Sequence, residues 1–420
     1  MRQSNLFTKT NKKPPADEDS KNATLLRQAG FIHKEAAGVY SFLPLGKRVR
    51  DNIEEIIREE MDAVGGQELD LTALQDQNLW QQTDRWSDEA IDVWFKTALK
   101  NGTEMGLATT HEEPIPNMLT HHAESYRDFP VAVYQFQTKF RNELRAKAGI
   151  MRGREFLMKD LYSFSRTQKE HDDFYEKMKS AYKRIFARVG IGADTHYTYA
   201  DGGSFSEFSH EFQTESEAGE DTIYLSTDDD LAVNEEVLSD DVLEKLNLDQ
   251  DNLQETTAIE VGNIFPLGTK FSKPLGLTYT DKDGQDQPVI MGSYGIGVGR
   301  LMGAITEIKA SEDNLLWPES VAPFEVHLLR LGDSEDVVAE TRTVYKTLQG
   351  AGVSVLYDDR NASAGEKFAD SDLYGLPFQV IVSEKTENKG KLEVTFRPNT
   401  EPAYLELSEL IAKLANTQHE

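Results

Sequence analysis

The first strong pattern of apolar and polar positions runs from Gly46 to Val64. Apolar side chains recur there at the three- and four-residue spacing of one helix face, namely at Val49, Ile53, Ile56, Ile57, Met61 and Val64. The pair Gly65-Gly66 is a helix stop signal. The residues that follow, Leu69 to Leu74, predict a strand.

A second pattern, with period two, covers residues 131–143 (VAVYQFQTKFRNE). One face of the predicted strand carries Ala132, Tyr134, Phe136, Thr138 and Phe140. The other face carries Gln135, Gln137, Lys139, Arg141 and Glu143. A strand with one long polar face usually turns that face to water, and here the face ends in Arg141 and Glu143 and continues into the basic loop 144–155. Residues 156–164 alternate in the same way, with Phe156, Met158, Asp160 and Tyr162 on one face, so the two strands and the basic loop 144–155 predict an antiparallel hairpin with a long loop.

Further along, residues 168–190 predict a helix that ends at Gly190. The acidic and weakly patterned segment 225–258 predicts a surface excursion of one or two short helices. Strand patterns return at 259–265 and 288–294, followed by the glycine-rich segment 292–299 and a helix from Arg300. We expect the glycines of that segment to let a ligand lie against bare backbone.

The pattern changes beyond Pro318 and Pro323. Predicted strands at 325–331, 353–357, 378–382 and 392–396 alternate with predicted helices at 334–348, 365–373 and 405–414. Such alternation is typical of a small α/β domain. We therefore expect two domains, residues 1–318 and residues 319–420.

Charge changes this picture at one place. The formal net charge is -28, yet residues 201–260 alone contain 19 acidic residues and one basic residue. By contrast, the window 139–160 is a basic island that contains Lys139, Arg141, Arg145, Lys147, Arg152, Arg154 and Lys159. Local positive charge in an acidic protein suits focused binding of a polyanion such as ATP.

The composition excludes several classes of site. The chain has no cysteine, which excludes disulfides, thiolate zinc sites and a cysteine nucleophile. No apolar run has the length of a signal peptide or of a membrane span. We expect a cytoplasmic protein without a membrane partner. His121-His122 has no acidic partner at metal-binding spacing, so we expect no resident metal, zinc included.

Several segments combine residues that suit binding of a nucleotide and a carboxylate. Arg141 and Glu143 share a strand face, where an arginine fork can bind carboxylate and phosphate together. On this segment alone, an exposed cross-strand ion pair remains the alternative. The loop residues Arg152 and Arg154, with Phe156, could bind phosphates and stack on a purine, or form a solvated turn beside a core ring. The segment from Gly292 to Arg300 lacks the setting of a dinucleotide-binding loop.

Together these segments resemble class II aminoacyl-tRNA synthetases, and in detail the bacterial type of prolyl-tRNA synthetase. The resemblance runs from Leu43-Pro44-Leu45-Gly46 through Thr110-His111-Glu112-Glu113 and Phe140-Arg141-Asn142-Glu143 to GREFLMKDLYS at 153–163. It continues through SHEFQ at 209–213, GNIF at 262–265, MGSYGIG at 291–297 and the segments 357–360 and 367–370. It implies an α/β fold in which an antiparallel sheet flanked by helices forms an α+β catalytic domain, followed by a small mixed α/β anticodon-binding domain.

The resemblance also implies roles for individual residues. Arg141, Glu143 and Arg300 are the implied catalytic residues. The implied ATP-binding residues are Arg141, Glu143, Arg152, Arg154, Phe156, Glu260 and Arg300, with Glu260 on the magnesium side. The implied proline-binding residues are Thr110, Glu112, Arg141, His210 and Ser293. Asp359, Arg360 and Lys367 are implied contacts of the tRNA anticodon. The implied partners are L-proline, ATP with Mg²⁺, the proline tRNA and a second copy of the chain.

The chain departs from the family pattern at four places. Only the segment 225–258 stands where the family usually carries an editing domain, so we expect no editing in cis. Ser293 replaces a usual cysteine, and Thr72 replaces a proline of motif 1, which belongs to the dimer interface. Ser206-Glu207 replaces a Gly-Gly pair, which places an extra carboxylate at the rim of the pocket.

Two alternative functions are weighed against proline activation. A threonine-specific enzyme would use a Cys/His zinc site, which a chain without cysteine cannot build in that form. A tRNA-binding module that has lost activation would usually lack the equivalents of Arg141, Glu143 or Arg300, and all three are present.

Overall fold

The structure is a computed structural model that describes residues 1–144, 148–202, 208–226, 231–399 and 401–417. These residues form two compact units, each of which is described by itself. One unit comprises residues 34–40 and 53–304, and the other comprises residues 1–33, 41–52 and 305–420. The first segment of the chain thus belongs to the same unit as the last.

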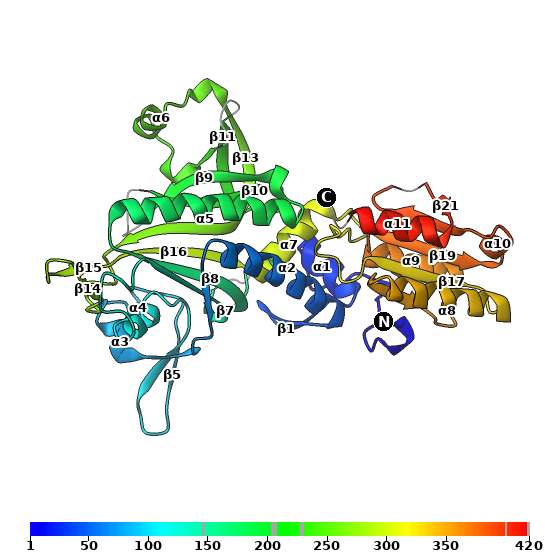
Figure 1. Ribbon diagram of the computed structural model, residues 1–420, viewed down its shortest axis with the longest axis horizontal. Coiled ribbons are helices and arrows are strands. Elements are labelled where there is room, and N and C mark those ends of the chain that lie inside the picture. Colours follow the sequence, from blue (N-terminus) through cyan, green and yellow to red (C-terminus); the bar gives the residue numbers. More distant parts are fainter. Residues whose placement is uncertain (145–147, 203–207, 227–230, 400, 418–420) are drawn as a thin grey trace. The chain divides into compact units, whose positions relative to one another are not determined.

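A nine-stranded, largely antiparallel sheet is the centre of the first unit (Figure 1). Its strands lie in the order β10-β9-β12-β11-β13-β16-β8-β7-β3, and β10 also pairs with β13. Their bounds are β3 Gln67–Leu69, β7 Val131–Phe140, β8 Glu155–Ser165, β9 Thr195–Asp201, β10 Phe208–Glu215, β11 Asp221–Ser226, β12 Ala232–Asn234, β13 Leu253–Gly268 and β16 Ile290–Gly297. The predicted hairpin is confirmed, because β7 and β8 pair antiparallel from Val131↔Phe164 to Phe140↔Glu155.

The helix α5 (Gln168–Arg188) lies across one face of this sheet (Figure 1). Thr167 caps its first turn by accepting a hydrogen bond from the backbone of Glu170. Gly190, with a φ of 88°, follows its end, as the sequence predicts. The helix buries its apolar side against the sheet, with Tyr175, Met178, Ala181, Tyr182, Ile185 and Phe186 buried. The opposite face of the sheet is therefore the one available to a ligand.

The expectation for the segment 225–258 is wrong in part. A short helix is present, α6 (Asp240–Leu246), but β12 and the start of β13 also come from this segment. Ala232, Val233 and Asn234 of β12 are buried, because this strand pairs with β11 and β9 and is part of the sheet. The segment therefore completes the sheet as well as forming surface. Residues 227–230 lie outside the described part of the chain.

The structure differs from the sequence pattern in three further respects. The strand predicted over Leu69–Leu74 is divided into β3 and β4 (Leu74–Asp76), which pair with different partners. The polar face of β7 does not lie against water, since Gln135 and Lys139 are fully buried. They are buried because Asp160 of β8 offers a carboxylate to both side chains. The helix expected from Arg300 begins two residues earlier, as α7 (Val298–Lys309).

The remaining elements belong to the first unit or cross its borders in the sequence. They are β1 Ile32–Ala36, β2 Val39–Phe42, α2 Pro44–Ala63, α3 Gln77–Gln81, β5 Phe95–Ala98, β6 Glu104–Leu107, α4 Pro114–Leu119, β14 Thr278–Thr280 and β15 Asp286–Pro288. Short 3₁₀ turns lie at Gly149–Met151, Gly192–Asp194, Glu235–Val237 and Gln250–Asn252.

The C-terminal part of the second unit contains the predicted mixed α/β domain. A five-stranded sheet has the order β18-β17-β19-β20-β21, parallel over its first three strands and antiparallel beyond. The strands are β17 Val326–Leu331, β18 Val355–Asp358, β19 Phe378–Ser383, β20 Leu392–Phe396 and β21 Ala403–Leu405. The helices are α8 Glu335–Gly350, α9 Ala364–Tyr374, α10 Glu384–Glu387 and α11 Leu407–Thr417, and near the N-terminus the 3₁₀ turn η1 (Gln3–Asn5) and α1 (Lys21–Gln28) belong to the same unit.

Candidate functional site

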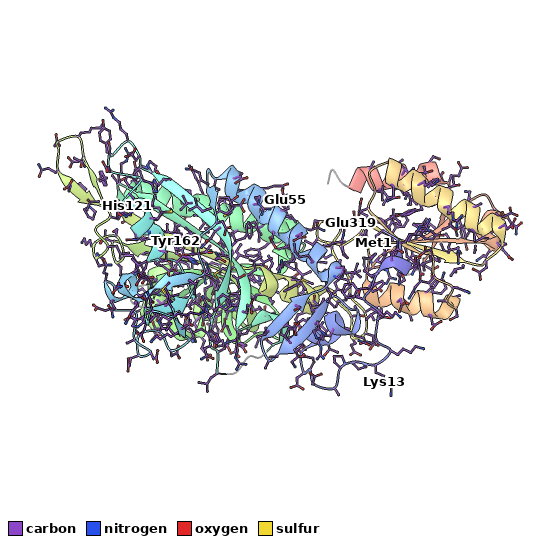
Figure 2. The ribbon with its side chains drawn as sticks, turned by 90° about the horizontal axis from the view of Figure 1, so that it is seen from below. Met1, Lys13, Glu55, His121, Tyr162 and Glu319 are labelled. Atoms are coloured by element: carbon purple, nitrogen blue, oxygen red, sulfur yellow. The ribbon has the colours of Figure 1, made fainter. Side chains whose placement is uncertain are left out.

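The register of β7, β8 and β16 assembles one polar face of the sheet. Asp160 lies opposite Gln135 on one side and Gly295 on the other. Tyr162 is paired in the same way with Ser293. Directly paired residues project to the same face of a sheet. The predicted polar side of β7 is therefore continuous with Ser293 and Gly295, in the row that includes Tyr162, which Figure 2 labels. The helix α5 packs on the other face, where its Tyr182 hydroxyl accepts from Lys159.

Three cavities meet on this face, and Arg141 and Glu143 line all three. The Arg141 guanidinium lies 5.3 Å from the centre of the Phe156 ring. Within the part of the chain that the structure describes, it makes no side-chain hydrogen bond and no ion pair. Burial, and then the charge of Arg300, lowers its pKa. The carboxylates of Glu260, Glu112 and Glu143 lie near enough to favour its charge, but none contacts it directly, so the guanidinium is open to an anionic ligand.

The first cavity, of about 50 Å³, lies between the hairpin and α7. Phe156, Gly295, Gly297 and Arg300 line it together with Arg141. Arg300 is held in place from one side, because its Nε donates to the Met151 carbonyl at 2.9 Å and its Nη1 donates to the Glu260 carboxylate at 2.7 Å. The narrow slot thus has an aromatic ring and a guanidinium in its walls.

The glycines of β16 serve two different purposes. A Cβ atom on Gly295 would meet Asn263 Oδ1 at 2.8 Å, at the wall of the first cavity. A Cβ atom on Gly292 would instead lie 2.5 Å from the Tyr294 hydroxyl, inside the protein. The expectation that these glycines serve a ligand is therefore wrong for Gly292, which is needed for packing.

The second cavity, of about 260 Å³, is rich in acidic side chains. Glu220, Asp221 and Glu260 line it beside Arg152. The Arg152 guanidinium donates to Glu143 at 2.9 Å and to Glu220 at 3.0 Å. Burial, and then the charge of Glu260, raises the pKa of Asp221. Excess negative charge beside a cation-lined slot would suit a divalent cation that accompanies a polyphosphate.

Glu211 adds to this acidic group, although the sequence did not single it out. Gln213 donates to Glu211 at 2.8 Å and to Asp221 at 2.7 Å, which ties the two carboxyl groups together. Burial, and then Glu260, raises the pKa of Glu211 to about 8. The signal that could have found it is the strand alternation of residues 208–215, which places Glu211 and Gln213 on one face.

The third cavity, of about 270 Å³, contains the predicted proline-binding pair. Thr110 donates a short hydrogen bond to Glu112, and Ser293 lies in the same lining. Arg85, which the sequence did not indicate, approaches Glu112 at 3.5 Å and Glu113 at 2.9 Å. Gln75 donates to the Thr110 carbonyl at 2.9 Å and so fixes the backbone of the pair. The cavity thus offers an ordered carboxylate and a hydroxyl near Arg141.

His210 does not line any of these three cavities, contrary to the expectation. Its ring stacks on Tyr197 at 4.6 Å, and its Nδ1 lies 2.7 Å from the hydroxyl of Tyr175 on α5. Burial lowers its pKa to about 4. The physical reason is the period of the strand: His210 and Phe212 face α5, whereas Glu211 between them, paired with Asn263, lies on the face of the sheet that carries Gly295.

Other predicted residues are engaged within the protein. The Arg154 guanidinium donates to the backbone carbonyls of Glu143 and Ala37 at 3.0 and 2.9 Å, and Arg154 is absent from the cavity linings. In the C-terminal domain, Lys367 is only 2% exposed and its ammonium donates to the Arg330 carbonyl at 2.7 Å. That burial is at odds with a direct contact to RNA.

Two neighbours of Lys367 remain closer to the surface. Arg360 pairs with Asp358 at 2.6 Å and with Asp370 at 2.8 Å. Asp359 accepts two hydrogen bonds from Ser4. Ser206-Glu207, which was expected to alter the rim of the pocket, lies outside the described residues.

A buried network lies behind the third cavity. The Lys139 ammonium, fully buried, lies 2.9 Å from Asp160 Oδ2 and 2.6 Å from His111 Nδ1. Burial, and then the charge of Lys139, lowers the pKa of His111 to about 4, so the imidazole is neutral. Because Nδ1 accepts from Lys139, Nε2 carries the proton and donates to the Thr72 carbonyl at 3.2 Å. The network therefore fixes the chain at Thr72 and beside Thr110.

The described residues contain no group of three or more histidine, aspartate or glutamate side chains placed to hold a metal ion. Among the same residues, no helix is both long enough and apolar enough to cross a membrane.

Two family descriptions match the chain. Residues 95–309 match the tRNA synthetase class II core domain (G, H, P, S and T), and residues 321–417 match the anticodon binding domain. Among solved structures, the prolyl-tRNA synthetase of Cryptosporidium parvum in complex with halofuginone and AMPPNP has a TM-score of 0.79 at 17% identity, covering 94% of this chain and 76% of that one. The Giardia lamblia prolyl-tRNA synthetase in complex with prolyl-adenylate has a TM-score of 0.77, covering 93% and 75%. These likenesses show the same fold.

Curated relatives extend over nearly the whole chain. The proline–tRNA ligase of Zymomonas mobilis is 38% identical, with 96% of each chain covered, and that of Rhizorhabdus wittichii is 38% identical, with 99% of this chain and 100% of the relative covered. The ligase of Bacillus cytotoxicus is 32% identical over 567 aligned positions, more than the 420 residues of this chain, so it carries additional sequence that this chain lacks. The chain belongs to the proline–tRNA ligases of the class II synthetases, as a short form without the insertion domain.

Proposed function

We propose that this protein activates L-proline with ATP and then transfers the proline to the 3′ end of the proline tRNA. In the first step, a carboxylate oxygen of proline attacks the α-phosphorus and pyrophosphate leaves. In the second step, a hydroxyl of the terminal ribose attacks the carbonyl carbon and AMP leaves. Neither step requires a protein nucleophile, so catalysis consists of positioning and charge stabilisation.

The observation that carries this proposal is the position of Arg141. Its guanidinium borders the slot of Phe156, the acidic cavity and the cavity of Thr110, and it has no anion of its own among the described residues. A planar fork at that junction can bind the proline carboxylate and the α-phosphate at once. The negative charge that develops during attack then has a partner already in place.

The remaining roles follow the three cavities. In the proposal, Phe156 and Arg300 enclose the adenine, and Glu143 accepts from its amino group. Arg152 exchanges its carboxylate partners for the outer phosphates. Mg²⁺ would enter with ATP, and Glu260, which lines both the slot and the acidic cavity, would supply a carboxylate to it. The acidic surroundings that raise the pKa of Glu211 would be relieved by such a cation.

The third cavity accounts for the choice of proline. Thr110 and Glu112 would bind the secondary ammonium of proline, with Ser293 in the opposite wall. Arg85 pairs with Glu112 in the cavity and with the fully buried Glu113, and so partly neutralises both carboxylates. His210 supports the sheet from the side of α5 and is not proposed to touch proline.

Several wider features belong to the same proposal. The chain near residue 318 divides a catalytic domain from an anticodon-binding domain in which Asp359 and Arg360 lie near the tRNA. The protein is a cytoplasmic homodimer, without zinc and without editing in cis. Sedimentation would reveal the dimer, and alanyl-tRNA misacylated on the proline tRNA should persist in the presence of the pure protein. Its rapid deacylation would contradict the absence of editing.

The decisive experiment is proline-dependent exchange between ATP and labelled pyrophosphate. We expect exchange with L-proline and much less with alanine or threonine at equal concentration. A protein that binds the proline tRNA but shows no exchange with any amino acid would contradict the proposal.

A further inference from the structure

The first 13 residues of the chain form a segment that we call the basic arm. It contains Arg2, Lys9, Lys12 and Lys13 and no acidic residue, in a protein whose net charge is -28. The arm belongs to the same compact unit as the C-terminal domain. Its charge therefore contrasts with that of its surroundings.

The domain that matches the anticodon-binding family is itself acidic. Residues 321–417 contain 16 acidic and 10 basic residues. Of the basic residues, Lys367 is buried and Arg360 is bound to two carboxylates. RNA binding depends on lysine and arginine that can reach phosphates. Other basic residues of the domain, such as Lys346 and Lys391, are exposed, but acidic residues outnumber basic ones, so positive charge from another segment would strengthen RNA binding.

The basic arm is fastened to this domain along its length. The Met1 carbonyl accepts from the backbone of Tyr357 in β18 at 2.9 Å. Ser4 donates from its backbone and its hydroxyl to Asp359 at 3.1 and 3.0 Å, and Thr10 donates to Asp370 at 2.5 Å. Figure 2 labels Met1 beside the strands of the domain and Lys13 at its outer edge. The contacts fix the arm while they occupy acidic groups that would repel phosphate.

The arm and the N-terminal part of α9 line a groove of about 1150 Å³. Its lining contains Lys9, Lys12 and Arg360, and also the acidic residues Asp313, Glu366, Asp370 and Asp372. Two of these carboxylates are engaged, Asp370 by Thr10 and Arg360, and Glu366 by Lys12 at 3.9 Å. Lys9 and Lys13 are exposed, with no carboxylate within ion-pair distance among the described residues. Phe7, between the two fastened parts of the arm, has 75% of its surface exposed. An exposed ring between exposed cations, beside a groove, is the arrangement that proteins use for single-stranded nucleic acid.

We infer that the basic arm binds the anticodon loop of the tRNA, with Lys9, Lys12 and Lys13 on its phosphates and Phe7 stacked on an unpaired base. Scattered exposed lysines and single exposed rings are common and need no ligand. Here they occur together, on an acidic domain of the anticodon-binding family, and beside a groove. The inference deepens the proposed function and depends on the protein being a tRNA ligase.

The test uses the full-length protein with Lys9, Lys12 and Lys13 all replaced by alanine. We expect its affinity for the proline tRNA to fall about tenfold at moderate salt, and the slope of log affinity against log salt to decrease by about 2, as for three lost contacts to single-stranded phosphates. Proline-dependent ATP–pyrophosphate exchange, which needs no tRNA, should remain as in the parent protein. A matched control replaces Lys169, Lys177 and Lys273, three exposed lysines of the other unit, and should alter the slope much less.

A second variant separates stacking from charge. Phe7→Ala should weaken tRNA binding about tenfold with an unchanged salt slope, and Phe7→Trp should restore it. Unchanged tRNA affinity in both the lysine variant and Phe7→Ala would overturn the inference and leave the arm as a site for a protein partner or as solvated surface. Loss of affinity equal to that of the control triple variant would also overturn it. If the lysine variant unfolds at lower temperature, tRNA binding by the Lys9→Ala, Lys13→Ala double variant is measured instead, because these two side chains pair with no carboxylate of the described residues. Failure of the parent protein in the exchange assay would count against the proposed function alone, since tRNA binding is measured separately.

Discussion

Lys139 and Arg141 lie two residues apart on one face of the same hairpin, but only the charge of Lys139 is paired directly with a carboxylate of the described residues. Lys139 is fully buried, with Asp160 2.8 Å from its ammonium and His111 2.6 Å from it. Arg141 borders three cavities and has no carboxylate partner among the described residues. Removing a buried charge that is paired with an opposite charge destabilises the fold. A charge at a cavity that has no direct partner is instead available to bind a ligand. The sequence pattern alone does not distinguish the two residues.

The largest expected effect is the loss of activity on substitution of Arg141, which has no direct ion-pair partner among the described residues. Arg141→Gln should lower the rate of proline-dependent ATP–pyrophosphate exchange about a thousandfold, because the charge of the transition state loses its preorganised partner. Arg141→Lys should recover only part of the rate, since an ammonium cannot form the planar fork. The free energy of unfolding should not decrease, as no anion is left behind. Arg127→Gln, an exposed arginine of the same unit, is the matched control for chemical denaturation and exchange.

The next largest expected effect is a loss of stability on substitution of Lys139, which is paired with Asp160. Lys139→Met should reduce the free energy of unfolding by about 3–5 kcal/mol, because Asp160 is left buried without its cation. Adding Asp160→Asn should recover a large part of this loss. Lys159→Met is the matched comparison: Lys159 is also fully buried, but it donates to the Tyr182 hydroxyl and the Tyr294 carbonyl, at 2.7 and 2.9 Å, and not to a carboxylate. Equal losses for the two lysine variants in urea denaturation would break the comparison.

A smaller effect is expected in the cavity that the buried network supports. Glu112→Gln should raise the KM for proline about 10- to 100-fold, since a charged hydrogen bond to the ammonium of the substrate is replaced by a neutral one. The KM for ATP should change little, because Glu112 lines the third cavity only. Initial rates of exchange at varied proline and varied ATP separate the two. A parallel rise in both constants would indicate that Glu112 supports the whole site and not proline alone.

The sequence predicts those features of the structure that depend on residues close together in the chain, and it misses those that depend on residues far apart in the chain. The period of residues 131–143 and 156–164 depends only on local backbone geometry, and it correctly predicts the hairpin and the shared face of Lys139 and Arg141. The exposure of that face depends on Asp160 and on loop residues such as Thr72, which reach it from other parts of the chain. The same period also places Glu211 and His210 on opposite faces of their strand, which the family resemblance to His210 does not take into account.

Long-range contacts account for what the sequence missed. Arg85 reaches Glu112 and Glu113 from a loop before β5. Nothing in its own segment predicts a binding site, because the neighbouring Trp80 and Trp86 are equally typical of a hydrophobic core. The strands of the segment 225–258 were missed for a similar reason. Short strands such as β12 are stabilised by the sheet they join and not by their own pattern.

The smallest predicted effect is a change of stability with pH, and it tests the buried network of Lys139, Asp160 and His111. The pKa of His111 is lowered from 6.5 to about 4 in the folded protein, so between these pH values the unfolded chain binds more protons than the native one. The His111 contribution to stability is then complete above pH 6.5 and is lost as the pH falls toward 4. Between pH 6.5 and pH 5 the parent protein should lose about 2 kcal/mol that a His111→Gln variant does not lose. Urea denaturation at both pH values measures this difference, with His121→Gln, an exposed histidine, as the control. Equal losses in the parent and in His111→Gln would mean that the imidazole beside Lys139 takes up protons as easily in the folded protein as in the unfolded chain. The contrast with Arg141 would then fail, because it depends on Lys139, Asp160 and His111 forming a buried network.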